Sequence, residues 1–197
     1  MIILQDRSQP ITVKLIDFGL AMTRDQIQQG AELQVLCFRA PELLLGLPFS
    51  EAIDMWSLGC VMYSMLTCNF ISKAKTPYQA MLTLVDLLGM PPDDLLEQAP
   101  EAPKFFRKSK NGTWRIKETK LRQTFRRIYK DFSLDQLKDV RLETNNRFEA
   151  EEREQCVELL KALLVMDWRK RITPAEVLSH PFITGIRTQN PPKGLRD

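Results

Sequence analysis

The segment from Glu51 to about Thr67 constrains the fold of this chain more than any other, because apolar residues cover every face of the helix that it predicts. Ser50 stands before it as the expected N-cap, and its first turn carries an acidic side chain. A helix that is apolar all round is a buried helix. The segment therefore predicts the axis of a hydrophobic core around which the other elements pack.

Caps, periodicity and turn residues predict the remaining elements, which are mostly helices. The expected helices follow the cap at Thr76-Pro77, cover 151–165 and follow the cap at Thr173-Pro174, with short patches near 121–129 and 134–137. Two β-branched apolar runs, Met1–Leu4 and Ile11–Ile16, flank turn residues and predict a β-hairpin. Residues 20–39 show no periodicity and predict a long loop. The fold class expected is mainly α (α+β), with one short hairpin at the start.

Composition indicates an ordinary globular domain and excludes several kinds of site. The chain has 197 residues, of which 44% are hydrophobic and 27% are charged. Its net charge of +3 does not by itself indicate binding to nucleic acid or to a membrane. Four cysteines without metal or disulfide spacing predict a reducing compartment, nuclear or cytoplasmic. His180 is the single histidine, which excludes histidine-based zinc sites and Ser-His-Asp triads. No segment has the length and hydropathy of a membrane span or the pattern of a signal peptide.

Three short motifs follow one another along the first third of the chain. They are Asp17-Phe18-Gly19, Ala40-Pro41-Glu42 and the run from Asp54 to Cys60. The first ends an expected strand, where the carboxylate of Asp17 suits a magnesium ion beside phosphates and Gly19 permits unusual backbone dihedrals. Alone, such a tripeptide is as consistent with an ordinary turn after a strand. The argument rests on the order and spacing of all three motifs.

Taken with these motifs, several longer runs make the chain resemble the C-terminal lobe of a eukaryotic protein kinase. The runs are Phe38–Gly46, Leu47–Trp56, Lys170–Pro174 and His180–Phe182. They are similar to the CMGC group, and most to the homeodomain-interacting protein kinases. The resemblance covers nearly the whole chain. It implies a hairpin over 1–16, an activation segment over 17–42, a helical lobe over 43–187 with an insert at about 91–150, and a loose tail over 188–197.

The resemblance also implies roles for individual residues. Asp17 would bind Mg²⁺ beside ATP, with Phe18 and Gly19 as its neighbours in the activation segment that Ala40, Pro41 and Glu42 close. Arg39 matches the arginine that shapes the site for a proline after the phosphorylated residue, so the implied substrates are proteins of Ser/Thr-Pro type.

Other matched positions are structural. Glu42 would form a buried ion pair with Arg171, whereas the other interpretation is two independent surface charges. Trp56 and Gly59 would belong to the core helix. Asp54 would be a buried carboxylate whose partners come from a catalytic loop, or would face solvent near the start of the helix.

Some positions depart from the kinase pattern. Glu32 stands where relatives carry an activating tyrosine, Leu36 where they carry an arginine, and Cys37 where they carry a tyrosine. Glu32 has one negative charge against nearly two for phosphotyrosine, and no basic residue stands close by in sequence. We therefore expect that regulation by phosphorylation at this tyrosine is lost, and that the segment has no obvious source of order.

Several kinase motifs do not occur in these 197 residues. There is no glycine-rich loop, no strand lysine in a Val-Ala-Ile-Lys context and no His-Arg-Asp loop. By the resemblance, the aspartate that acts as general base would lie before Met1, so no catalytic residue is assigned in the chain. Phosphoryl transfer depends on positioning and electrostatics, which Asp17 cannot supply alone. We expect the chain by itself to be inactive. The three hypotheses are part of a Ser/Thr kinase that uses ATP and Mg²⁺, a non-catalytic interaction module or pseudokinase, and a gene-model fragment.

One charged segment stands apart from these motifs. From Lys104 to Lys130 there are eleven basic side chains and one acid, Glu118, with Phe105, Phe106, Trp114 and Phe125 interleaved. One interpretation of this pattern is a site for an acidic partner, and the other is a solvated surface whose aromatic rings pack inward. No nucleic-acid motif accompanies the charge, so we do not expect nucleic acid to bind.

Overall fold

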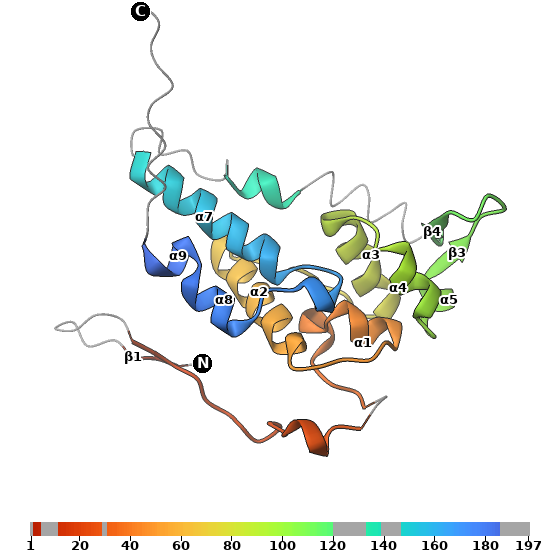
Figure 1. The fold of residues 1–197 in the computed structure, drawn as a ribbon, viewed down its shortest axis with the longest axis horizontal. Helices are drawn as coiled ribbons and strands as arrows, with labels where there is room; N and C mark the ends of the chain where they lie inside the picture. The colour runs from red at the N-terminus through yellow and green to blue at the C-terminus, as the bar shows by residue number, and fades with distance from the viewer. Residues whose placement is uncertain (1, 5–11, 29–30, 120–132, 139–146, 186–197) are drawn as a thin grey trace, which may run out of the picture. The chain divides into compact units, whose positions relative to one another are not determined.

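The fold is mainly helical, as expected, in a computed structural model that describes residues 2–4, 12–28, 31–119, 133–138 and 147–185 (Figure 1). The chain divides into two compact units, Met1–Ala31 and Glu32–Asp197. The division falls inside the segment that the sequence predicts as the activation segment. Each unit has a structure of its own.

The first unit contains the predicted hairpin. Strand β1 (Ile2–Leu4) pairs antiparallel with β2 (Thr12–Lys14), with Ile3 opposite Val13. A 3-10 turn, η1 (Arg24–Gln26), follows after the Asp-Phe-Gly motif. This confirms the hairpin and the irregular backbone expected after residue 20.

The second unit is built on helices. Its helices are α1 (Pro41–Leu45), α2 (Ala52–Thr67), α3 (Pro77–Leu88), α4 (Asp93–Gln98), α5 (Ala102–Phe105), α7 (Arg147–Leu163), α8 (Pro174–Ser179) and α9 (Pro181–Thr184). Its 3-10 turns are η2 (Leu36–Phe38), η3 (Leu134–Lys138) and η4 (Trp168–Lys170), and its strands are β3 (Phe106–Lys108) and β4 (Trp114–Ile116). The expected helical patch at 121–129 and the tail from 188 lie outside the described residues.

Capping side chains set the starts of these helices close to where the sequence predicts them. Thr76 accepts a hydrogen bond from the Gln79 N–H, and Thr173 forms a complete capping box with Glu176. At α3 the Gln79 side chain accepts from the Lys75 N–H, one residue earlier than a capping box requires. Ser50 accepts from the Ala52 N–H, one residue before the formal cap of α2. Differences of one residue at helix ends are usual.

One large core joins these helices. Helix α2 packs against α7 and η2, and α3 packs against α1, α5 and η2 (Figure 1). Trp56 and Cys60 of α2 are buried together with Met81 and Leu82 of α3. Gly59 allows the close approach of α2 to α7, because a Cβ atom there would lie 2.8 Å from Leu164 Cδ2.

The prediction that α2 is buried on every face was wrong. Leu58 is 45% exposed and Met65 is 71% exposed. Asp54 is also exposed, so the expected buried carboxylate is not present. The apolar composition of α2 therefore does not mean that all of its side chains are buried. The solvent-facing interpretation of Asp54 is the correct one.

Candidate functional site

A buried ion pair between Glu42 and Arg171 joins the end of the predicted activation segment to the core. Arg171 Nη1 lies 2.7 Å from Glu42 Oε1, Arg171 Nη2 lies 2.9 Å from Glu42 Oε2, and neither side chain is exposed. Nη1 also donates to the Ala52 carbonyl oxygen at 2.7 Å, while Nε and Nη2 donate to that of Val165. All five guanidinium hydrogens therefore have acceptors, as a buried arginine requires. The two residues are a buried ion pair and not independent surface charges.

The aromatic ring of Trp56 lies beside this ion pair. The guanidinium carbon of Arg171 lies 5.1 Å from the centre of the Trp56 ring, within the range of a cation–π interaction. Trp56 stands in the second turn of α2 and is 1% exposed. Three positions of the kinase resemblance, namely Glu42, Trp56 and Arg171, thus come together at one place. They join α1, α2 and the loop after η4.

Arg39 lies just before this pair and binds the backbone of its own segment. Its Nε donates to the carbonyl oxygens of Leu33 at 3.1 Å and Gln34 at 3.2 Å, and its Nη2 donates to that of Gln34 at 3.0 Å. Gln34 has a φ of 61°, in the left-handed region that residues other than glycine seldom adopt. The conformation turns the Gln34 carbonyl toward Arg39, so the charge of Arg39 compensates for the backbone strain.

The side chain of Gln34 joins this segment to α2. Its Nε2 donates to the Ile53 carbonyl oxygen and to Ser57 Oγ, both at 2.8 Å, and its Oε1 accepts from the Ala40 N–H at 2.9 Å. One amide therefore bridges the loop, the start of α1 and the first turns of α2. Glu32 is exposed. The order of the segment comes from Gln34 and Arg39.

Asp17 belongs to the first unit, after β2. Its carboxylate is exposed and its φ is 67°, whereas Gly19 keeps a negative φ. The unusual backbone conformation thus falls on the aspartate and not on the glycine that the sequence singled out. Phe18 is exposed, and its carbonyl oxygen accepts from the Ala21 N–H at 3.0 Å. The described residues hold no group of three His, Cys, Asp or Glu side chains that could bind a metal ion.

Comparison with known proteins identifies the family to which this arrangement belongs. The protein kinase domain family matches residues 2–183. The chain is a member of the protein kinase family. It is 36% identical over 191 residues to homeodomain-interacting protein kinase 2 of Mesocricetus auratus, which covers 89% of this chain and 16% of that protein. It is 34% identical over 207 residues to homeodomain-interacting protein kinase 4 of Homo sapiens, covering 93% of this chain and 34% of that protein.

The chain covers only part of the length of each of these relatives. The chain spans 16% of homeodomain-interacting protein kinase 1 of Mus musculus, at 35% identity. It therefore spans about a third or less of the length of these relatives. Among the described residues, no helix has the length and hydrophobicity to cross a membrane.

Sequence reasoning missed Gln34 and Ser57, whose hydrogen bond joins the predicted activation segment to α2. No charge, cap or periodicity marks Gln34, since its role depends on a positive φ and on partners 19 and 23 residues further along the chain. It also missed the network of Arg169, whose guanidinium binds Asp167 and, at 2.7 Å, Asp94. That arginine holds the pKa of the Asp167 carboxyl below its usual value, chiefly through their hydrogen bond. The Asp-x-Arg spacing at 167–169 was the available signal.

Proposed function

We propose that the chain is part of a serine/threonine protein kinase that phosphorylates hydroxyl groups followed by proline. In the longer protein the γ-phosphate would come from ATP with Mg²⁺. The 197 residues on their own would be inactive, because they contain no His-Arg-Asp loop and no lysine in the context that binds nucleotide. Membership of the kinase family supports the reaction class, and the geometry around Arg39 supports the proline requirement.

The hydrogen bonds of Arg39 to the Gln34 carbonyl oxygen carry this proposal. In a kinase of this group, the residue after the phosphorylated one lies against this part of the activation segment. An ordinary residue there brings an N–H that needs an acceptor, and a donor left unsatisfied costs about 1–3 kcal/mol. Arg39 already binds the Gln34 carbonyl oxygen twice. Proline has no N–H, so it avoids the cost.

The residues present fit one part of the cofactor requirement. Asp17 offers an exposed hard oxygen ligand, and Mg²⁺ is often bound through one or two carboxylates together with substrate phosphates. Backbone strain at a carboxylate of this kind is common at functional sites. The sequence has no glycine-rich loop and no Val-Ala-Ile-Lys lysine for holding the nucleotide, so Asp17 is proposed only as a ligand of Mg²⁺. Bound Mg²⁺ would supply neutralisation of phosphate charge.

A chimera tests this function directly. The N-terminal part of the kinase domain of homeodomain-interacting protein kinase 2, through its catalytic loop, would precede residues 1–197. We expect the chimera to phosphorylate a Ser-Pro peptide in preference to the matched Ser-Ala peptide, and residues 1–197 alone to phosphorylate neither. Asp17→Ala should abolish transfer. Arg39→Ala should reduce the preference for proline about tenfold, as expected for the loss of a charged hydrogen bond.

Arg39→Lys is the matched control, because it keeps the charge and loses the fork that reaches two carbonyl oxygens. Equal use of both peptides by a folded chimera would contradict the proline proposal. A folded chimera with no transfer would favour the alternative, a non-catalytic interaction module. The acidic partner expected at the basic segment is a separate matter and does not depend on these results.

A further inference from the structure

The β3–β4 hairpin places two arginines directly opposite each other. Phe106 pairs with Ile116, and Arg107 pairs with Arg115. Two further backbone hydrogen bonds fix this register: the Ser109 N–H donates to the Thr113 carbonyl oxygen, and the Lys117 N–H donates to that of Phe105. Phe106 and Ile116 are buried in the core, and both arginines are exposed. Like charges directly opposite each other destabilise a sheet. The hairpin keeps this pair at a cost to its own stability.

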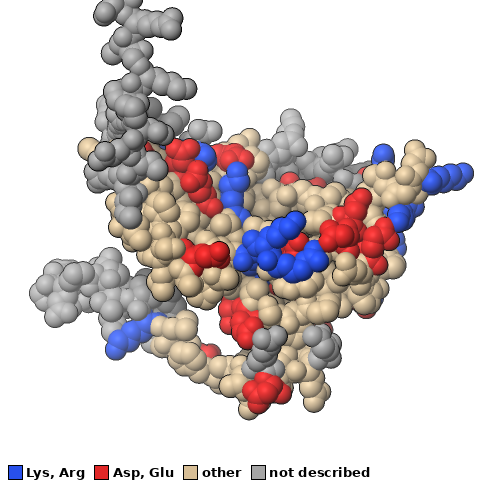
Figure 2. All heavy atoms as spheres, viewed as in Figure 1, with Lys and Arg blue, Asp and Glu red and all other residues tan. Residues whose placement is uncertain are grey.

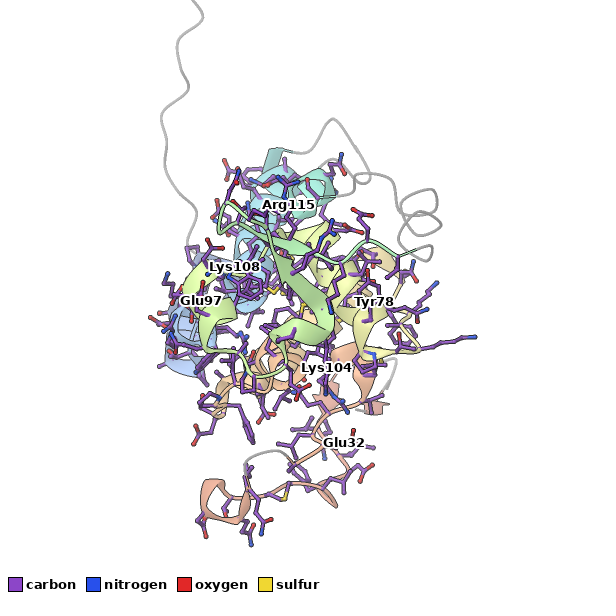
Figure 3. All side chains as sticks on the ribbon, turned by 90° about the vertical axis from the view of Figure 1, so that its right-hand side faces the viewer. Glu32, Tyr78, Glu97, Lys104, Lys108 and Arg115 are labelled. Atoms are coloured by element: carbon purple, nitrogen blue, oxygen red, sulfur yellow. The ribbon has the colours of Figure 1, made fainter. Side chains whose placement is uncertain are left out.

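Most of the lysines near this hairpin differ from the two arginines, because they have partners close by. Three lysines around the hairpin have local partners: Lys104 with Glu101, Lys108 with Glu97, and Lys117 with the Pro103 carbonyl oxygen. Figure 3 shows Lys108 and Glu97 close together. No described acid or carbonyl binds Arg107 or Arg115. Figure 2 shows basic side chains where the hairpin projects in Figure 1. The local acids thus pair with Lys104 and Lys108 and leave the two guanidinium groups available.

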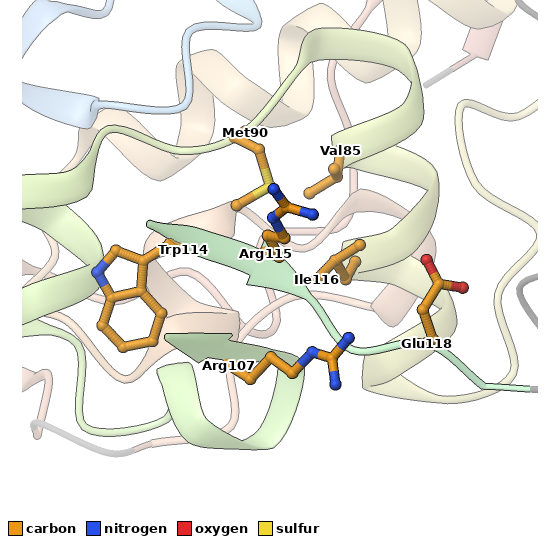
Figure 4. Close-up of a pocket in the computed structure, with 7 residues that line it drawn as sticks. All are labelled: Val85, Met90, Arg107, Trp114, Arg115, Ile116 and Glu118. Carbon is orange, nitrogen blue, oxygen red and sulfur yellow. The ribbon is translucent and has the colours of Figure 1, made fainter. Parts of the chain in front are cut away.

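A pocket of about 320 Å³ lies beside these arginines (Figure 4). Its lining combines the two arginines and Glu118 with four apolar side chains: Val85, Met90, Trp114 and Ile116. Two cations against one carboxylate give the lining a net positive charge. The volume is at the lower end of that of small ligand sites and suits one or two side chains.

We propose that this pocket binds a short acidic segment of a partner protein, in which a bulky apolar side chain is flanked by Asp or Glu. The apolar side chain would contact Val85, Met90 and Ile116. A flanking carboxylate would accept hydrogen bonds from Arg107 and Arg115, in the bidentate geometry for which arginine is suited. The bound carboxylate would also offset the repulsion between the two arginines.

The surroundings of Trp114 favour such a peptide over nucleic acid. Its indole Nε1 donates to Glu97 Oε1 at 3.2 Å, and Lys108 Nζ lies 5.5 Å from the centre of its ring. The ring is thus already occupied by a cation and an acceptor, whereas proteins that bind single strands use free aromatic faces for stacking.

Fluorescence anisotropy with the full chain tests the proposal. The probes are fluorescein-labelled peptides with leucine flanked by glutamates, with leucine flanked by glutamines, with glutamates and no leucine, and with leucine flanked by phosphoserines, together with a labelled single-stranded oligonucleotide. We expect the glutamate–leucine peptide to bind most tightly. Arg107→Glu and Arg115→Glu should each weaken it by about tenfold or more, since each reverses a charge at the contact.

Lys110→Glu is the matched control, because Lys110 is an exposed cation of the same hairpin that does not line the pocket. It should change the affinity by less than about threefold. A second measurement requires no ligand: Arg115→Gln should raise the Tm of the chain, because it removes the repulsion from Arg107. Circular dichroism verifies that each variant is folded.

Four results would overturn the proposal. They are no binding of the glutamate–leucine peptide, equal binding of the glutamine peptide, equal loss with Lys110→Glu, or tighter binding of the phosphoserine peptide or the oligonucleotide. None of these measurements involves ATP or phosphoryl transfer. Their failure therefore leaves the proposed kinase function untouched.

Discussion

At the scale of single residues, Gly59 sets how closely α2 and α7 can approach. A Cβ atom at this position would lie 3.0 Å from Leu163 Cβ and 2.8 Å from Leu164 Cδ2. We predict that Gly59→Ala lowers the free energy of unfolding by about 1–3 kcal/mol through overpacking, although alanine is the better helix former. Urea denaturation measures the loss. Ser64→Ala, on the same helix but partly exposed, is the control, and a stabilised Gly59→Ala variant would contradict this account.

The Glu42–Arg171 pair makes a second prediction at this scale. Removing either partner leaves a buried charge, so Glu42→Ala and Arg171→Ala should each cost about 3–5 kcal/mol. The double variant should cost clearly less than the sum, because the second substitution removes a charge that already lacks its partner. Denaturant melts of the four proteins form the cycle. Additive losses would show that the 2.7 Å contact contributes nothing in solution.

Asp167 should make the stability of the folded chain depend on pH. Its carboxylate accepts from Arg169 Nε at 2.8 Å and lies 3.7 Å from Lys170 Nζ, while Asp94 shares the same arginine. These bonds lower the pKa of Asp167 in the folded chain. Its contribution is therefore present above the unfolded pKa of about 3.9 and is lost as the pH falls through the lower folded value.

We predict that Asp167→Asn destabilises the chain at about pH 7, and that the difference from the wild type shrinks toward about pH 3. Chemical denaturation across this range measures the difference. Glu152→Gln, at an exposed position on α7, controls for the general effect of removing a carboxylate. A difference that is constant with pH would mean that the hydrogen bond geometry, and not the charge, supplies the effect.

At the residue scale, the sequence predicted correctly that Glu42 and Arg171 contact each other. It did not predict correctly which side chains of α2 are exposed to solvent. The contact of Glu42 with Arg171 followed from the kinase resemblance across 129 positions. Asp54 was expected to be buried because its neighbours in the helix are apolar, yet it is exposed with Leu58. Hydrophobicity does not specify which side of a helix its neighbours cover. That depends on where the other elements of the fold lie.

At the scale of elements, Gln34 connects the predicted activation segment to α2 and to the start of α1. Gln34→Ala removes two donors and one acceptor, and we predict a loss of about 1–3 kcal/mol together with faster amide hydrogen exchange at Ala40. Hydrogen exchange followed by mass spectrometry locates the change between residues 33 and 40. Gln28→Ala, at an exposed position, is the control.

Gln34→Glu refines this test. It keeps the acceptor for the Ala40 N–H but places a carboxylate oxygen against the Ile53 carbonyl oxygen, where an N–H stood. It should therefore be at least as harmful as the alanine variant. Unchanged exchange in both variants would show that Arg39 alone orders the segment.

The elements themselves were largely predictable, because caps are local signals. Thr76, Thr173 and the prolines that follow them place the starts of α3 and α8 correctly. The β3–β4 hairpin was not predicted. Its strands have three residues each and flank a turn within a basic run, where charge conceals the alternation of buried Phe106 and Ile116 with exposed arginines.

At the scale of the whole molecule, the chain divides into the units Met1–Ala31, which contains the metal-ligand candidate Asp17, and Glu32–Asp197. The described core clusters draw their buried residues from Ala40 to Met166, within the second unit. We therefore predict that a chain of residues 32–197 unfolds in a single cooperative transition. Its free energy of unfolding should lie within about 0.5 kcal/mol of that of the full chain, because a unit with its own core folds independently.

Urea denaturation followed by tryptophan fluorescence measures this directly, since Trp56, Trp114 and Trp168 all lie in the second unit. Val13→Asp in the full chain is the companion variant, because it places a charge in the first hairpin without shortening the chain. Both variants should retain the midpoint of the parent. A lower midpoint in both would show that the hairpin stabilises the helical unit, and a lower midpoint in the truncated chain alone would assign the effect to the new end at Glu32.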